Sequence, residues 1–168
     1  MSEIINKVAS SGLKSIDIKD YYPRLDIVSI DLKEQLFQGF VLREKDFRTW
    51  CKDLDWNQFE DKHIALHCTA DAIIPVWAYM LVTQSLEGVA QSVSFGNQSE
   101  TERNLVAQHF LNLDVSEFKD QRVIIKGCSE INEPETAFLS FTACLKPLVK
   151  SLMFGEACSS VPIYKKPK

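Results

Sequence analysis

The chain has 168 residues, a length that suits one domain with its own hydrophobic core. Apolar residues make up 45% of it and charged residues 25%, as in ordinary globular proteins, and its net charge of −4 disfavours nonspecific binding to nucleic acid or anionic membranes. No apolar run approaches the roughly 18 residues that span a bilayer, and the first residues lack the pattern of a signal peptide. We therefore expect a cytoplasmic protein.

The first third of the chain is predicted to be rich in β-structure. Alternating apolar and polar residues indicate strands over residues 13–18 and 25–30, and a third candidate strand covers 36–42 with Gly39 at a bend. A short helix is predicted over 44–54, because its apolar residues recur with helical spacing.

From residue 63 onward, predicted strands and helices alternate. The strands cover residues 63–68, 89–95 and 122–127. Two of the helices cover residues 74–86 and 134–154, and a third, between them, begins with a capping box at Ser99. Pro147 lies inside the last helix and removes one of its hydrogen bonds, so we expect a kink or a break there.

Strands that alternate with helices favour parallel pairing and right-handed crossovers. We therefore predict a single α/β domain over residues 1–168, built on a mostly parallel mixed sheet with flanking helices. Its N-terminal β-rich part, about residues 1–60, would add an antiparallel edge or a small flanking β-layer to the alternating part, about residues 61–168.

Two stretches of the alternating part echo each other. Residues 63–68 and 122–128 are apolar runs that end in a cysteine, and each is followed by an acidic loop and then by a proline, Pro75 or Pro134. In an open α/β sheet, this junction between strand and helix is where ligands usually bind. If both strands belong to one parallel sheet, their two cysteines lie at the same carboxyl edge.

The five cysteines fall into two groups. Cys51 and Cys144 lie on apolar helical stripes, and we expect both to be small core residues. Cys68, Cys128 and Cys158 lie at the ends of elements or in loops, where they could act as free thiols in a reducing compartment. The sharper hypothesis for these three is a metal site, with zinc or another thiolate-preferring metal as the ion.

Whether Cys158 reaches that edge depends on Pro147. A straight helix of ~20 residues is about 30 Å long and would carry Cys158 to the opposite edge, whereas a break would let the chain fold back. Asp71 or His67 is the candidate fourth ligand. Neighbouring strand residues point to opposite faces, so His67 could bind the same ion as Cys68 only where the strand ends or bulges.

Several blocks of the chain together resemble a bacterial family of domains of unknown function, and the resemblance covers nearly the whole chain. The blocks are residues 42–48, 68–80, 126–128 and 150–162. The resemblance implies that Cys68, Asp71, Cys128 and Cys158 recur in the family, but it implies no known activity. The chain departs from the family pattern at Ala157, where proline is common, and at Val76, where threonine is common, and neither change removes a candidate ligand.

Three functions stay open at this point. The first is a metal-binding domain, the second is a thiol- or metal-dependent enzyme with Asp71 or His67 as acid or base, and the third is an interaction or structural module whose cysteines only pack. Dinucleotide-binding, phosphate-binding and hydrolase glycine motifs are absent. Tyr79 and Met80 lie off the apolar stripe of their helix and could face a partner. The sequence identifies no partner and leaves a homo-oligomer open.

Overall fold

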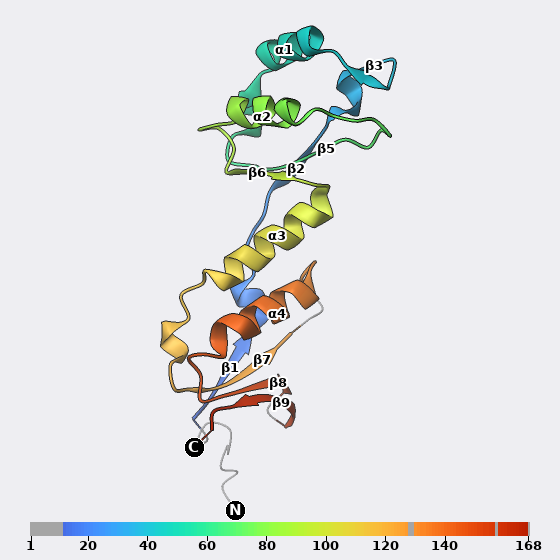
Figure 1. The fold of residues 1–168 in the computed structure, drawn as a ribbon. Helices are drawn as coiled ribbons and strands as arrows, with labels where there is room; N and C mark the ends of the chain where they lie inside the picture. The colour runs from blue at the N-terminus through green and yellow to red at the C-terminus, as the bar shows by residue number, and fades with distance from the viewer. Residues whose placement is uncertain (1–11, 128–129, 157, 168) are drawn as a thin grey trace, which may run out of the picture. The chain divides into compact units, whose positions relative to one another are not determined.

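The computed structural model describes residues 12–127, 130–156 and 158–167 (Figure 1). Its parallel strands and flanking helices confirm the predicted α/β class. The helices are α1 (Glu44–Asp53), α2 (Val76–Ser85), α3 (Gln98–Leu111) and α4 (Pro134–Leu145). The strands are β1 (Leu13–Asp17), β2 (Ile27–Asp31), β3 (Leu36–Phe37), β4 (Val41–Leu42), β5 (His63–His67), β6 (Ser92–Phe95), β7 (Arg122–Lys126), β8 (Ser151–Glu156) and β9 (Ser159–Lys165). Within the described ranges, no helix is long and apolar enough to cross a membrane.

The chain divides into two compact units. Unit 2 is Arg24–Glu102, and unit 1 combines Met1–Pro23 with Arg103–Lys168, so the whole of unit 2 is inserted between the two segments of unit 1. Each unit has its own parallel sheet, with strand order β1-β7-β8-β9 in unit 1 and β2-β5-β6 in unit 2. Helix α3 carries the chain from unit 2 into unit 1.

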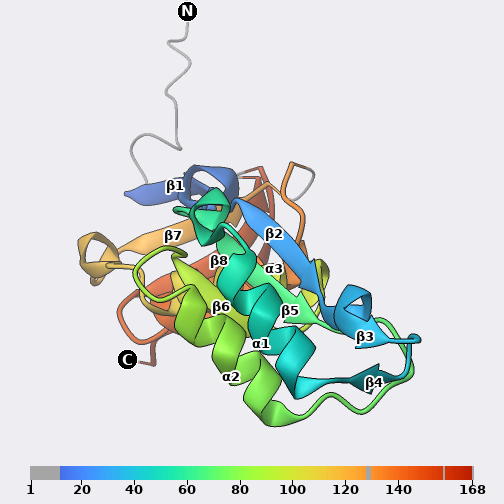
Figure 2. The same cartoon turned by 90° about the horizontal axis from the view of Figure 1, so that it is seen from above.

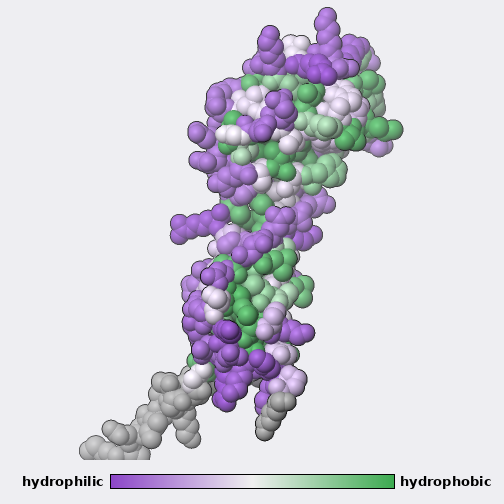
Figure 3. Space-filling model, turned by 60° about the vertical axis from the view of Figure 1, so that its left-hand side comes forward, coloured by the Kyte–Doolittle hydropathy of each residue, from purple (hydrophilic) through white to green (hydrophobic). Residues whose placement is uncertain are grey.

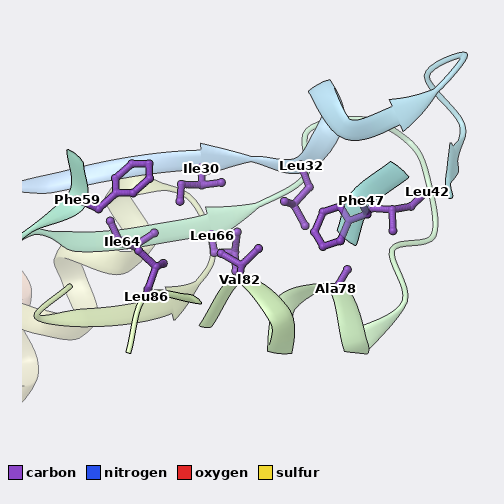
Figure 4. Packing of buried hydrophobic residues seen from close by; sticks show 10 residues of the cluster. All are labelled: Ile30, Leu32, Leu42, Phe47, Phe59, Ile64, Leu66, Ala78, Val82 and Leu86. Carbon is purple, nitrogen blue, oxygen red and sulfur yellow. The ribbon is translucent and has the colours of Figure 1, made fainter. Parts of the chain in front are cut away.

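In unit 2, β2, β5 and β6 pair in parallel, and α2 forms the crossover from β5 to β6. Helices α1 and α2 lie side by side (Figure 2). Their apolar residues and those of the strands form one core, in which Leu66 of β5 and Val82 of α2 point toward one another, and Phe47 lies beside Leu42 and Ala78 (Figure 4). Burial of these apolar side chains is what holds the helices on the sheet.

In unit 1, β1, β7 and β8 pair in parallel, and α4 forms the crossover from β7 to β8. Strand β9 then turns back and pairs antiparallel with β8. The core contains Ile125 and Leu152 from the strands and Phe141 and Leu145 from α4, all at most 2% exposed.

The two units are built to the same plan, with a constant offset of 59 residues along the chain (75 to 134). Adding 59 to a residue number in unit 2 gives the corresponding residue of unit 1, from Leu54 and Leu113 to Gly96 and Gly155. The two stretches align over this range without an insertion or a deletion. Buried positions in and directly after α2 correspond to buried positions of α4: Ala78 to Ala137, Val82 to Phe141, and Leu86 to Leu145. The identical pairs include Pro75 and Pro134, Thr83 and Thr142, Ser92 and Ser151, and Phe95 and Phe154.

Backbone geometry follows the same offset. The amide of Asp61 donates to the carbonyl of Val89 at 3.1 Å, and the amide of Asp120 donates to that of Leu148 at 2.9 Å. Asp61 and Asp120 have positive φ angles of 58° and 56°. The Tyr79–Phe95 and Phe138–Phe154 ring pairs are both edge-to-face at 87°, with centroids 5.4 and 5.3 Å apart. Such agreement identifies a repeated α/β unit.

The first strand of each unit also matches. Residues 15–17 of β1 and 29–31 of β2 both read Ser-Ile-Asp, and in each the Asp caps a 3₁₀ turn by accepting a hydrogen bond from the amide two residues later. Both strands pair in parallel, with β7 and β5 respectively. The prediction that the N-terminal strands form an antiparallel edge or flanking layer is therefore wrong, because each is an edge of a parallel sheet.

Three further predicted elements differ in the structure. Helix α4 ends at Leu145, and residues 151–154 of the predicted helix belong to β8 instead, because Pro147 breaks the helix and the chain turns back. The predicted strand over 36–42 is the β3–β4 hairpin, with positive φ angles at Gln38 and Gly39. Helix α3 begins with Asn97 and Glu100 as its reciprocal capping pair, two residues before the expected box.

Candidate functional site

The carboxyl edge of the unit 2 sheet is organised around Asp31, the last residue of β2. Its Oδ1 accepts hydrogen bonds from the amides of Lys33 and Thr69, each at 3.0 Å, and its Oδ2 accepts one from the Thr69 hydroxyl at 2.5 Å. Partial burial alone would raise the pKa of Asp31, but these hydrogen bonds outweigh it and lower the pKa to about 2. Asp31 therefore connects β2 to the loop after β5 as a carboxylate.

His67 is the last residue of β5, and Cys68 follows it directly. Cys68 packs against the unit 2 core, and its Sγ is 3.9 Å from the carbonyl oxygen of Ala70. His67 pairs with Asp31 in the strand register, and its Nε2 is buried with no hydrogen-bond partner among the described residues. Asp71 is exposed in the loop that follows.

Cys158 lies at the carboxyl edge of the other sheet, that of unit 1. The break at Pro147 lets β8 run parallel to β7, so the turn after β8, which contains Cys158, follows the end of that strand. Cys158 is exposed there. Cys128 follows the neighbouring strand β7 in the sequence, but it lies outside the described residues. Of the two alternatives left open by the sequence, the structure shows the break, with the chain folding back so that β8 pairs with β7.

The three candidate metal ligands do not follow strands of a single sheet. Cys68 follows β5 of unit 2, whereas Cys128 and Cys158 follow β7 and β8 of unit 1. The expectation of one shared sheet edge for Cys68 and Cys128 is therefore wrong, because the alternating strands divide between two sheets. Among the residues that the structure describes, no group of three or more His, Cys, Asp or Glu side chains is placed to hold a metal ion.

The other cysteines lie in apolar surroundings. Cys51 packs against the unit 2 core, and the Sγ of Cys144 is 3.7 Å from the carbonyl oxygen of Leu113. Burial raises the pKa of both thiols, with Arg48 opposing the shift at Cys51. A raised pKa disfavours the thiolate, which is the reactive and metal-binding form.

Unit 1 contains an apolar cavity of about 520 Å³ beside α4, β8 and β9. Its lining residues are Ile125, Pro134, Glu135, Phe138, Leu139, Thr142, Leu152, Met153, Phe154 and Ile163. Three of them, Leu139, Phe154 and Ile163, expose 74%, 37% and 51% of their area. The cavity is therefore open to solvent and has an apolar wall, with Glu135 and Thr142 as its polar side chains.

Unit 2 has a hollow at the corresponding place, beside α2 and β6. It measures about 630 Å³ and is lined by Tyr79, Met80, Thr83, Gln84, Leu86, Glu87, Gly88, Ala90 and Val93. The repeat relates Tyr79, Met80, Thr83 and Val93 to four residues of the unit 1 cavity, namely Phe138, Leu139, Thr142 and Leu152. Met80 is 65% exposed, consistent with its predicted position off the core stripe.

Sequence reasoning missed the unit 1 cavity. The sequence predicts a helix through residue 154, with Leu152 on its apolar stripe, whereas this stretch lines the cavity as strand β8. One available signal was the 59-residue offset, because it aligns Leu139 with Met80, a residue already expected to face outward.

Comparison with known proteins places the chain in a family, but it finds no similar curated protein or solved structure. A search of the curated proteins and a search of the solved structures returned no match. The family model described as "Protein of unknown function (DUF2480)" matches residues 2–166, nearly the whole chain. This match confirms the resemblance carried by the blocks around Cys68, Cys128 and Cys158. The chain therefore belongs to this family of proteins of unknown function, DUF2480.

Proposed function

We propose that the protein is a non-catalytic binding module whose site is the apolar cavity of unit 1. The observation that carries the proposal is the cavity itself, because its volume of about 520 Å³ and its apolar wall are those of a small-molecule site. Such sites combine an apolar lining with a few polar groups that orient the ligand, a role that Glu135 and Thr142 can take here.

The lining defines the chemical class of the ligand. Leu139 and Ile163 leave apolar area in water, and a bound apolar group would remove that area at a gain of roughly 25 cal/mol per Å². Glu135 is the one charged residue of the lining. Its carboxylate disfavours an anionic head group, so we propose a neutral or cationic amphiphile with an acyl or aromatic body.

Binding can be tested with the neutral fluorescent probe N-phenyl-1-naphthylamine. We expect one saturable site per chain and easier displacement by decylamine than by decanoate, which have chains of equal length and opposite charge. Leu139→Glu should weaken probe binding about 10-fold or more, because a carboxylate replaces a side chain whose full burial is worth ~2 kcal/mol.

The matched control is Met80→Glu, since Met80 occupies the same position of the repeat in unit 2. Probe binding should survive this change. Equal loss in both variants, or no loss in Leu139→Glu, would show that the unit 1 cavity is not the site.

A thiolate metal site is the second candidate, favoured by one observation. Strands β7 and β8 are parallel neighbours, so Cys128 and Cys158 follow strands that end at the same sheet edge. Asp17 ends the adjacent strand β1, and its Oδ1 would lie 2.6 Å from a Cβ at Gly127, the residue before Cys128. Two thiols and a carboxylate are ligands that zinc accepts. Cys68 would lie outside such a site.

Elemental analysis of natively purified protein tests this candidate. We expect close to one equivalent of zinc per chain, reduced at least 10-fold in Cys158→Ser and retained in the Cys68→Ser control. Less than about 0.1 equivalent in the unaltered protein, in metal-replete medium, would rule the candidate out. Retention of the metal in Cys158→Ser would do the same.

A further inference from the structure

The two sheets differ in one respect: unit 1 has a fourth strand and unit 2 has none in its place. In unit 1, β9 pairs antiparallel along β8, from Ser151 opposite Lys165 to Glu156 opposite Ser159. The repeat relates β8 to β6. Among the described residues of unit 2, β6 is the last strand of its sheet, so its outer edge has no strand beside it. An uncovered edge strand is a ready template for pairing with another chain.

Apolar side chains gather beside this open edge. Ile73 is 94% exposed, Val76 72%, Met80 65% and Phe95 75%. Val76 and Met80 are four residues apart and therefore lie on one side of α2, and Ile73 lies in the non-helical segment just before the helix. Phe95 of β6 joins them through its edge-to-face contact with Tyr79. We call these four residues the α2–β6 patch.

The α2–β6 patch is large for a surface that faces only water. Four side chains that each expose about two-thirds or more of their area supply several hundred Å² of apolar surface, beyond what isolated exposed residues contribute. That is a substantial share of the ~800 Å² that each partner buries in a standard interface. Figure 3 shows one face of the molecule, on which apolar side chains, in green, are exposed among polar ones, in purple.

The charge pattern of α2 favours a second copy as the partner. None of the ten residues of α2 is charged, whereas six of the ten residues of the neighbouring α1 are. When a helix packs against its own copy, every charge on the facing side meets the same charge. An uncharged helix avoids this repulsion, and a self-complementary interface is the commonest kind in soluble oligomers.

We propose that the protein forms a symmetric dimer in which β6 pairs antiparallel with β6 of a second copy and the two α2–β6 patches pack together. The second β6 would take the place that β9 holds in unit 1. The two copies of α2 must lie on the same face of the joined sheet in order to pack together. This requires that each residue of β6 stands opposite a residue of the second β6 whose side chain points to the same face. A two-fold axis through Ser94 meets this condition, and it places Val93 of one copy opposite Phe95 of the other.

The hollow of unit 2 fits this arrangement. In antiparallel α2 helices related by that axis, Ile73 and Val76 of one copy lie next to the C-terminal half of the other. The hollow is lined there by Thr83, Gln84 and Glu87. Ile73 and Val76 lie just before and at the start of α2, whereas Thr83 and Gln84 lie in its last turn, so the two ends can meet in an isologous contact, with Met80 between them.

The mass of the 168-residue chain in solution tests the dimer. We expect light scattering after gel filtration, at about 10 to 100 µM chain, to report twice the chain mass of 19.1 kDa. Met80→Glu should give a monomer, because it places two carboxylates in the contact. Leu139→Glu, at the same position of the repeat in unit 1, should remain a dimer.

The register has its own test. Ser94→Cys, in a background with the exposed Cys158 changed to Ser, should form an intermolecular disulfide on mild oxidation, since Ser94 faces its own copy across the axis. Ser116→Cys in the same background, at an exposed position of unit 1 outside the proposed contact, should not. A monomeric unaltered protein over the whole concentration range would overturn the proposal, and so would a dimer that persists in Met80→Glu. The outcome can be told apart from that of probe binding in unit 1, because the variant that should disrupt one property is the control that should leave the other unchanged.

Discussion

At the scale of single residues, Asp31 shows how one side chain determines local structure. Three hydrogen bonds reach its two oxygens, one from Lys33 and two from Thr69. The side chain is only 20% exposed, so solvent screens these bonds weakly. They hold the loop after β5 against the end of β2, and thereby position Cys68 over the core of unit 2.

The lowered pKa of Asp31 predicts how stability depends on pH. A carboxyl whose folded pKa is about 2 and whose unfolded pKa is 3.8 stabilises the fold above pH 4, and this contribution disappears as the pH falls from about 4 to about 2. Asp31→Asn should therefore lower the free energy of unfolding at pH 7 by about 2 kcal/mol. Urea unfolding at pH 7 and at pH 2 measures both limits.

The exposed residue Asp71 provides the control for this prediction. Asp71→Asn should change the free energy of unfolding by no more than about 0.5 kcal/mol, as surface substitutions usually do. An Asp31→Asn variant that loses as much stability at pH 2 as at pH 7 would show that packing, rather than the ionised carboxylate, accounts for the loss.

At the scale of elements, the β8–β9 hairpin depends on Gly155. This residue has a φ of +113°, and a Cβ there would lie 2.7 Å from the carbonyl oxygen of Ser159, a backbone atom that cannot move away cheaply. Gly155→Ala should therefore destabilise the protein by about 2 kcal/mol or more, measured by urea unfolding.

Gly88 is the control that separates the cost of a steric clash from the cost of a positive φ angle. It also has a positive φ, +75°, but a Cβ there would meet no atom within 4 Å. Gly88→Ala should cost only about 1 kcal/mol, the usual penalty for a left-handed backbone. Equal losses at Gly88 and Gly155 would contradict the close contact inferred for the hairpin.

Helices and strands were predicted correctly where a local sequence pattern determines the secondary structure. The prediction failed where pairing with distant strands determines it. Residues 63–67 and 122–126 form the strands that their apolar runs predicted. Residues 151–156 carry apolar residues that also fit a helical stripe, yet they form β8. Pro147 showed where the helix must break, but the strand that follows is stabilised by β7 and β9, which the local sequence does not reveal.

At the scale of the whole molecule, the repeated unit explains the features that the sequence displayed only in part. The echo between residues 63–75 and 122–134 reflects two copies of one α/β plan. Its offset of 59 residues aligns Cys128 with Thr69 rather than with Cys68, so the two cysteines do not occupy equivalent positions. The differences between the units then become informative. One copy has β9 and an apolar cavity, and the other has the open edge at β6.

The sequence by itself determined the α/β class, most strand positions, the break at Pro147 and the family. These depend on local periodicity, on the missing amide of proline and on motif similarity. Only the tertiary structure decided that the parallel strands divide between two sheets, that Cys68 and Cys158 follow strands of different sheets, and that a cavity opens beside α4. The physical reason is that strand pairing and cavity shape arise from contacts between residues far apart in the chain, which no single segment specifies.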